Sequence, residues 1–212
     1  MIKAVVFDLD DTLIEIKFEG LKKVLEKTNK KLGLDYFTEE EINRLWFKPH
    51  RNEFLQQRFK INPENYWKVF NEFYTIKSMY KYYNVYPDIY ALTSLSKSKK
   101  IGILTSSSPK IGLYKIKLIE NVVGKVINNT LFIREHNIPD KPNPIGLELL
   151  IKKLGVDKNE TILVGDSDCD IETANNAGIP SILIERGHNK NGLIESDPDY
   201  VLKNLYQVRC YI

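Results

Sequence analysis

Short apolar segments alternate with helix-like segments over much of this chain, and this alternation constrains the fold more than any other feature. Continuous apolar strands separated by helical patterns are typical of a parallel sheet that helices cover on both faces. We therefore predict an α/β fold, with a Rossmann-like three-layer core built on a parallel sheet. The predicted strands are residues 3–7, 100–105, 161–165 and 181–184, with a weaker one at 200–202.

Two helical patterns lie between the later strands. Residues 142–155 carry Ile145, Leu149 and Leu150 on one expected apolar side, and Gly155 is expected to end the helix. Residues 170–178 form a second pattern that ends at its own glycine, shortly before a proline. Such helices are the connections that a parallel sheet requires.

Residues 15–87 have a different texture, because they show helical periodicity with no convincing strand beyond 13–17. We predict that they form a small all-helical domain inserted after the first strand. Residues 1–14 and 88–212 would then form the α/β core.

Three arginines recur every seven residues within the insertion, at Arg44, Arg51 and Arg58. A continuous helix would align them on one face, but Pro49 argues against such a helix. We expect a surface role for each single arginine more than a substrate contact. As a group with Lys48 and His50, they are expected to supply one contact to an anionic group.

The composition favours a cytoplasmic protein. Two cysteines, Cys169 and Cys210, give neither a disulfide framework nor metal-ligand spacing. No apolar stretch of the sequence approaches the roughly 20 residues of a membrane span, and the short apolar run near residue 5 does not resemble a signal peptide.

The net charge of +3 and the weak basic patches argue against nucleic-acid binding. A monomer and a homodimer both remain open.

Three carboxylates follow the first predicted strand, at Asp8, Asp10 and Asp11. Like charges this close repel one another, and burial makes their ionised forms still costlier. Such a cluster persists when a cation or a positive side chain lies among the acids, so the chain is expected to supply partners.

Candidate partners follow the other strands. Thr105 and Ser106 end the second strand before a predicted helix start, where hydroxyl and backbone N–H groups bind phosphate well. Lys141 offers a fixed positive charge, and Asp166 and Asp170 follow the third strand. Because the ends of parallel strands meet at one edge, we expect these groups to converge there. A hard divalent cation, with Mg²⁺ the natural candidate, would bind the carboxylates.

Four segments, in this order, resemble the motifs of the haloacid-dehalogenase-like (HAD) phosphohydrolases, closest to the phosphoglycolate-phosphatase-like branch. They are DLDDT (8–12), LTSSS (104–108), KPNP (141–144) and GDSDCD (165–170). The resemblance covers essentially the whole core, and the helical insertion lies where this family carries its first type of cap. It implies a Mg²⁺-dependent phosphatase that acts on a small phosphorylated metabolite.

The resemblance also implies roles for the candidate residues. Asp8 would be the nucleophile that forms an aspartyl-phosphate. Asp10 would act as general acid and base, with its backbone carbonyl facing the metal. The other roles are phosphate binding by Thr105, Ser106 and Lys141, metal coordination by Asp8, Asp10 and Asp166, and a supporting role for Asp170. Asp11, where many relatives carry Gly, is expected to cap a loop.

Three other functions are alternatives to a phosphatase for the same residues. A phosphomutase of the β-phosphoglucomutase type would return the phosphoryl group to a sugar, and the sequence barely separates it from a phosphatase. A phospho-accepting signalling module is disfavoured because receiver domains are shorter and place their Asp at a middle strand. A catalytically silent relative that is used only for binding is disfavoured, because no expected catalytic side chain is missing. His136 and His188 have no ligand-spaced partners and are expected to be ordinary surface or loop histidines.

Overall fold

The computed structural model describes residues 1–135, 138–188 and 194–212. The chain forms two compact units. The core unit consists of Met1–Glu15 and Val85–Ile212, and the helical unit consists of Ile16–Asn84.

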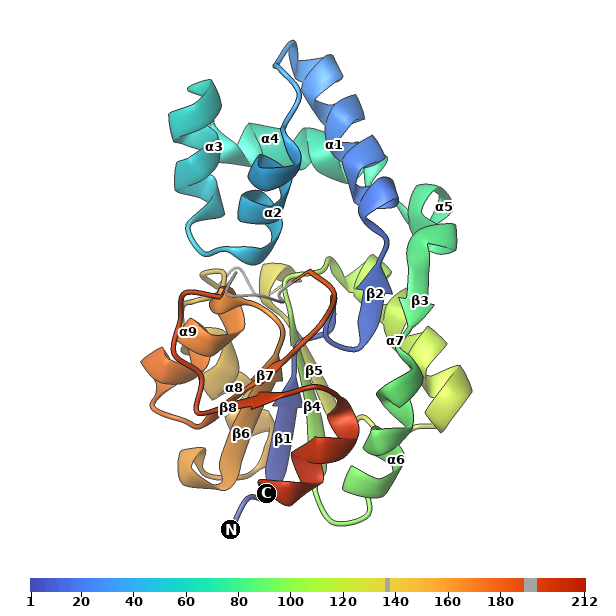
Figure 1. Cartoon of the computed structure of the whole chain (residues 1–212), viewed down its shortest axis with the longest axis vertical. Helices are drawn as coiled ribbons and strands as arrows, with labels where there is room; N and C mark the ends of the chain where they lie inside the picture. Colours follow the sequence, from blue (N-terminus) through green and yellow to red (C-terminus); the bar gives the residue numbers. More distant parts are fainter. Residues whose placement is uncertain (136–137, 189–193) are drawn as a thin grey trace. The chain divides into compact units, whose positions relative to one another are not determined.

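The core unit is built on a six-stranded sheet whose paired strands are all parallel, in the order β5-β4-β1-β6-β7-β8 (Figure 1). Its strands are β1 (Ala4–Phe7), β4 (Lys100–Thr105), β5 (Asn129–Phe132), β6 (Thr161–Gly165), β7 (Ser181–Ile184) and β8 (Tyr200–Leu202). The predicted α/β class and the five predicted core strands are confirmed. β5 was not predicted from the sequence, because its first two residues are polar and half-buried at the sheet edge and interrupt any apolar run.

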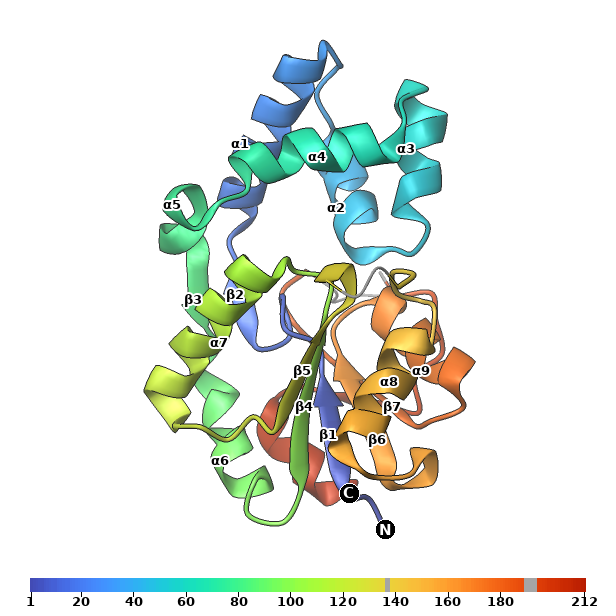
Figure 2. The same cartoon turned by 180° about the vertical axis from the view of Figure 1, so that it is seen from behind.

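Helices cover both faces of this sheet, as predicted for a three-layer core. Seen from both sides, α8 (Ile145–Leu154) and α9 (Asp168–Ala177) lie on one face, while the 3₁₀ helix η5 (Leu205–Cys210) lies on the other (Figures 1 and 2). The helix α6 (Ala91–Leu95) packs against η5. The remaining elements of the core unit are α7 (Pro109–Val123), η2 (Pro87–Tyr90), η3 (Ile133–Glu135) and η4 (Lys158–Glu160).

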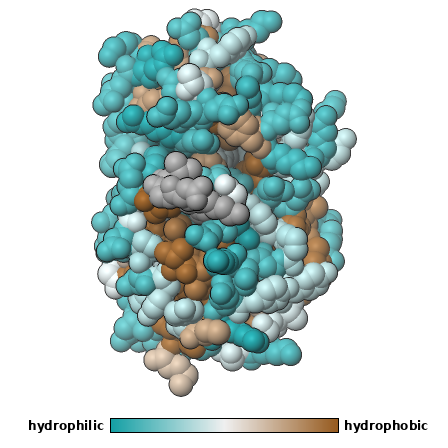
Figure 3. All heavy atoms as spheres, in the orientation of Figure 1, coloured by the Kyte–Doolittle hydropathy of each residue, from teal (hydrophilic) through white to brown (hydrophobic). Residues whose placement is uncertain are grey.

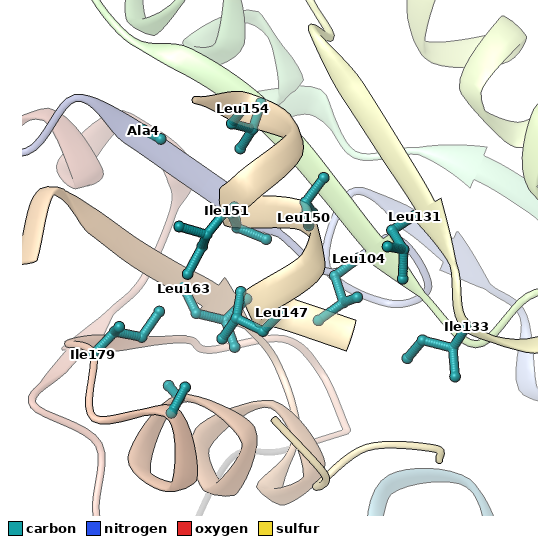
Figure 4. Close-up of a cluster of buried hydrophobic side chains, with 13 residues drawn as sticks. Ala4, Leu104, Leu131, Ile133, Leu147, Leu150, Ile151, Leu154, Leu163 and Ile179 are labelled. Atoms are coloured by element: carbon teal, nitrogen blue, oxygen red, sulfur yellow. The ribbon is translucent and has the colours of Figure 1, made fainter. Parts of the chain in front are cut away.

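An apolar cluster between α8 and the strands holds this layer in place (Figure 4). The buried side of α8 consists of Leu147, Leu150, Ile151 and Leu154, at the spacing of one helical face. Gly155 ends the helix in the left-handed conformation, as predicted. The predicted apolar side was wrong in part, because the side chains of Ile145 and Leu149 are exposed.

The helical unit contains five helices among its described residues, which are α1 (Phe18–Leu32), α2 (Glu39–Phe47), α3 (Arg51–Phe59), α4 (Pro63–Phe73) and α5 (Ile76–Met79), followed by η1 (Tyr80–Tyr82). Two short strands, β2 (Ile14–Ile16) and β3 (Tyr83–Val85), pair where this unit joins the core unit. The strand at 13–17 was foreseen, whereas β3 was missed.

Local signals set the helix boundaries of this unit. Thr38 and Glu41 form a capping box at the start of α2, and Asn62 caps α4 just before its Pro63. The break between α2 and α3 falls at residues 48–50, so the interruption predicted at Pro49 is confirmed.

The three arginines of the helical unit contact side chains within that unit. Arg44 lies over the Phe54 ring and Arg51 over the Trp67 ring, at 4.9 and 5.0 Å from the ring centres. Arg58 donates to Glu41 at 2.6 Å. Each arginine therefore has a structural partner of its own.

The surface drawn in Figure 3 is mostly hydrophilic, with apolar side chains in smaller groups. Within the described ranges of the chain, no helix is both long enough and apolar enough to span a membrane.

Candidate active site

The register of the sheet brings the predicted acids to one edge. β1 lies between β4 and β6 in the sheet (Figure 1). Phe7, the last residue of β1, pairs with Ile103 in β4 and with Val164 in β6. Asp8 continues this pairing, because its backbone N–H donates to the carbonyl of Val164 at 2.9 Å. Thr105 ends β4 and Asp166 directly follows β6, so both lie at the same edge as Asp8, where the sequence predicted them.

Lys141 lies between two of these acids. Its ammonium donates to Asp8 Oδ1 at 2.6 Å and to Asp170 Oδ1 at 2.5 Å. All three side chains are at least nine-tenths buried, with 8 % of the Lys141 side chain exposed. A residue 133 positions away from Asp8 thus supplies the positive charge that the acidic cluster requires.

Asp170 reaches this position because α9 begins with a capping box. The hydroxyl of Ser167 donates to Asp170 Oδ2 at 2.6 Å, and the Ser167 backbone N–H donates to the same oxygen at 3.2 Å. Its other oxygen remains available to Lys141. One carboxylate therefore caps the helix and also joins the cluster.

Asp166 contacts two side chains that lie far apart in the sequence. The hydroxyl of Thr12 donates to Oδ1, and Nε2 of His188 lies 2.9 Å from Oδ2. Burial lowers the pKa of His188, but the hydrogen bond and charge of Asp166 outweigh it and raise the pKa above the ordinary histidine value. His188 lies in the loop after β7, so the expected loop position is correct, but its contact with Asp166 was not expected. His136 lies outside the described residues.

A buried ion pair supports the loop after β1. Arg186 binds Asp88 through two nitrogens, at 2.9 and 3.2 Å, and donates to the Thr12 carbonyl at 2.6 Å. Because Thr12 in turn binds Asp166, this pair fixes the loop that carries the acids. Neither member of the pair was predicted from the sequence.

The carboxylates of Asp8, Asp166 and Asp170 form a group that could hold a metal ion. One oxygen from each lies within 4.8 Å of the other two, and all three residues are buried. Even with Lys141 and a charged His188 beside them, three ionised acids leave an excess of negative charge. Oxygen ligands with this excess charge fit a hard divalent cation such as Mg²⁺.

The pKa values of the cluster reflect this excess charge. Burial, the largest influence, raises the pKa of Asp8 well above its usual range, and the charges of Asp170 and Asp166 raise it further against the opposing effect of Lys141. Burial lowers the pKa of Lys141, but Asp170 and Asp8 outweigh it and hold the pKa above the ordinary lysine value. A cation among the acids would favour their ionised forms.

Asp10 lies outside this group of carboxylates and has partners of its own. Ser107 donates its hydroxyl to Asp10 Oδ2 at 2.6 Å, and the ammonium of Lys115 donates to Asp10 Oδ1. Thr105 is fully buried, and its hydroxyl oxygen accepts from the backbone N–H of Ser107 at 3.0 Å, while Ser106 is half-buried.

Ser107 and Lys115 were not predicted from the sequence as site residues. The sequence pattern could have indicated Lys115, because it occupies a position on the buried face of α7, among Ile111, Ile116 and Ile119. A lysine in an apolar stripe needs a partner inside the protein.

The backbone explains the acid at position 11. Asp11 has a φ of 61°, in the left-handed region that glycine adopts freely and that Asp tolerates better than most other residues. Its backbone N–H donates to the Ile14 carbonyl at 2.7 Å and closes the turn after β1. A turn-forming role therefore accounts for Asp11.

Gly165 gives the first testable prediction, because a Cβ at this position would lie 2.3 Å from Cβ of Asp170. We expect Gly165→Ala to displace Asp170 from Lys141. The phosphatase activity that the sequence motifs imply should fall by about 10- to 100-fold, as activity does when a supporting partner is lost at metal sites. Activity assays and Mg²⁺ titration by calorimetry would measure both effects. Gly187→Ala is the matched control, since no atom lies within 4 Å of a Cβ there. Equal behaviour of the two variants would contradict the prediction.

Comparisons with known proteins agree with this geometry. The chain matches the family described as haloacid dehalogenase-like hydrolase over residues 5–184. It is 28 % identical to a phosphoglycolate phosphatase of Aquifex aeolicus over 94 % of this chain and 92 % of the relative. A putative pyrophosphatase of Clostridium perfringens is 31 % identical over the same shares. The fold is similar to a solved haloacid dehalogenase-like hydrolase of Streptococcus pneumoniae, with a TM-score of 0.81 and 22 % identity over 99 % of this chain and 98 % of that one. The chain therefore belongs to the haloacid dehalogenase-like hydrolase family.

Proposed function

We propose that this hydrolase is a Mg²⁺-dependent phosphatase that cleaves a small phosphate monoester through an aspartyl-phosphate on Asp8. The observation that carries the proposal is the position of Lys141, which lies between Asp8 and Asp170 beside the three-carboxylate group. A nucleophilic carboxylate, a fixed cation and a metal-binding group at one sheet edge are the parts that phosphoryl transfer needs.

The metal would be held by Asp8, Asp166 and Asp170, with the backbone carbonyl of Asp10 as a further predicted ligand. The three carboxylates support this assignment by their mutual distances and burial. When bound, Mg²⁺ would supply charge stabilisation for the phosphoryl oxygens. Asp170, which the sequence analysis gave a supporting role, is thereby also a candidate ligand, directly or through water.

The chain's own residues would perform the remaining work. Asp8 attacks phosphorus while the bond to the leaving oxygen breaks, and Asp10 gives that oxygen its proton. Asp10 then takes a proton from the water that hydrolyses the aspartyl-phosphate and releases inorganic phosphate. Lys141, Thr105 and Ser106 hold the transferring group, and the charge of Lys141 offsets the charge that develops on it.

The helical unit, residues 15–87 in the sequence-based division, would serve as the cap that selects the substrate. Residues 1–14 and 88–212 would carry the chemistry. This division rests on the resemblance to capped members of the family and on the two compact units at Ile16–Asn84 and in the remainder of the chain.

The relatives narrow the substrates to be compared. One is named a phosphoglycolate phosphatase and another a putative pyrophosphatase, so a phosphorylated small acid and a diphosphate are the first two to test. Small phosphorylated sugars complete the comparison, because a phosphomutase of the β-phosphoglucomutase type would use the same Asp8 and Asp10.

Release of inorganic phosphate from such a panel, with Mg²⁺ or with EDTA, tests the proposal. We expect strong release from one or a few compounds with Mg²⁺ and a loss of at least about 10³-fold with EDTA, because the metal offsets much of the transition-state charge. Undiminished release in EDTA would overturn the metal assignment. Isomerisation of a sugar phosphate without net phosphate release would indicate a mutase instead.

A further inference from the structure

Lys115 is a fully buried lysine that the proposed chemistry has not yet used. It lies on α7, and none of its side chain is exposed to solvent. Lysines are almost never fully buried unless they are paired, because desolvating an ammonium is costly. Its position therefore requires a partner whose interaction offsets the free-energy cost of desolvating the ammonium.

The partner is Asp10. The ammonium of Lys115 donates to Asp10 Oδ1, and it also donates to the hydroxyl of Ser107 at 3.1 Å. The same hydroxyl donates to Asp10 Oδ2 at 2.6 Å. The three side chains thus form a closed ring of hydrogen bonds in which both carboxylate oxygens of Asp10 are held.

We propose that Lys115 and Ser107 are positioning residues for Asp10, which fix its carboxylate for proton exchange with the leaving oxygen. This inference rests on the proposed function of Asp10 as general acid and base. Lys141, by contrast, binds Asp8 and Asp170, so the site uses two separate lysines for its two catalytic carboxylates.

The Lys115 ammonium and the Ser107 hydroxyl give the two carboxylate oxygens of Asp10 different roles in proton transfer. An ammonium has three donors and no acceptor, so Oδ1 remains an acceptor as long as Lys115 binds it. A hydroxyl both donates and accepts, so Ser107 can turn toward or away from Oδ2. Oδ2 is therefore the oxygen whose partner permits a proton to be given to the leaving group and later taken from water.

The burial of Lys115 makes this arrangement rigid. An exposed lysine would lose much of its effect to solvent and rotamer freedom, whereas Ile111, Ile116 and Ile119 share the buried face of α7 with Lys115. Small displacements of a catalytic group lower rates strongly, because proton transfer depends on its geometry.

The test uses leaving groups that differ in their need for a proton. 4-Nitrophenyl phosphate loses a phenolate that leaves unprotonated, whereas phenyl phosphate and an alkyl phosphate need a general acid. The parameter kcat/KM is suited to this comparison, because it covers every step up to formation of the aspartyl-phosphate. It would be measured for wild type, Lys115→Met, Asp10→Asn and Lys117→Met.

We expect Lys115→Met to lower kcat/KM for phenyl and alkyl phosphates by about 10- to 100-fold, and for 4-nitrophenyl phosphate by less than about threefold. Lys117→Met is the matched control on an exposed position of the same helix and should leave all substrates unaffected. A uniform loss for all leaving groups, or no loss, would overturn the positioning role of Lys115.

Two further comparisons keep the test decisive. If Lys115→Met does not fold, Ser107→Ala removes the other donor to Asp10 and is expected to show the same selectivity for leaving groups at smaller size. Asp10→Asn should show the selectivity most strongly. If Asp10→Asn shows this selectivity but Lys115→Met and Ser107→Ala do not, the positioning role of Lys115 and Ser107 is wrong while the proposed role of Asp10 stands. If Asp10→Asn itself does not show the selectivity, the proposed role of Asp10 is contradicted.

Discussion

Asp8→Asn is expected to abolish phosphate release while the protein remains folded. An amide cannot serve as the nucleophile, so we expect kcat to fall by at least about 10⁴-fold, as when the nucleophile of other covalent catalysts is removed. The fold should survive because the shape of the side chain is kept. Burial and the nearby acids already raise the pKa of Asp8, so a neutral group at this position relieves repulsion.

Steady-state phosphate release and thermal unfolding of the metal-free protein would test both halves of this prediction. The unfolding midpoint should stay level or rise, since Lys141 keeps Asp170 as a partner at 2.5 Å. Asp197→Asn makes the same chemical change at an exposed position and serves as the control. Full activity of Asp8→Asn would remove Asp8 as the nucleophile.

Lys141→Ala is expected to damage both activity and stability. Loss of one group that stabilises developing charge typically costs about 10²–10³-fold in rate, and Lys141 is expected to reach at least the upper value because it also orients Asp8. Removing it leaves Asp8 and Asp170 buried without the ammonium, which costs about 3–5 kcal/mol of stability when such a pair is broken.

Urea unfolding and phosphate release would measure the two effects. Lys152→Ala, at an exposed position on α8, is the control and should change neither. Near-normal phosphate release by Lys141→Ala would contradict its role. A large loss of activity with unchanged stability would contradict the view that Lys141 holds the two acids together.

The gathering of the candidate site residues at one edge of the sheet could be predicted from sequence, because two simple regularities determine it. Apolar runs mark the parallel strands, and the polar residues after them necessarily lie at one edge of the sheet. Asp8, Thr105 and Asp166 are therefore brought together by strand order and register, without knowledge of any side-chain contact.

The missed strand β5 and the buried side of α8 lack such a regularity. β5 is short and half polar, and α8 buries Leu147 and Ile151, whereas Ile145 and Leu149 were expected on its apolar side. In both cases the burial of a residue depends on what packs against it, and periodicity in a short segment leaves that undetermined.

The sequence by itself determined the α/β class, most of the strands, and which acids and which lysine belong to the motifs. Only the tertiary structure decided that His188 contacts Asp166, that Arg186 binds Asp88, and that Lys115 is buried against Asp10. The physical reason is that strand ends are placed by local patterns and sheet pairing. Single long-range contacts between side chains instead depend on the path of each loop and on which face of a helix is buried.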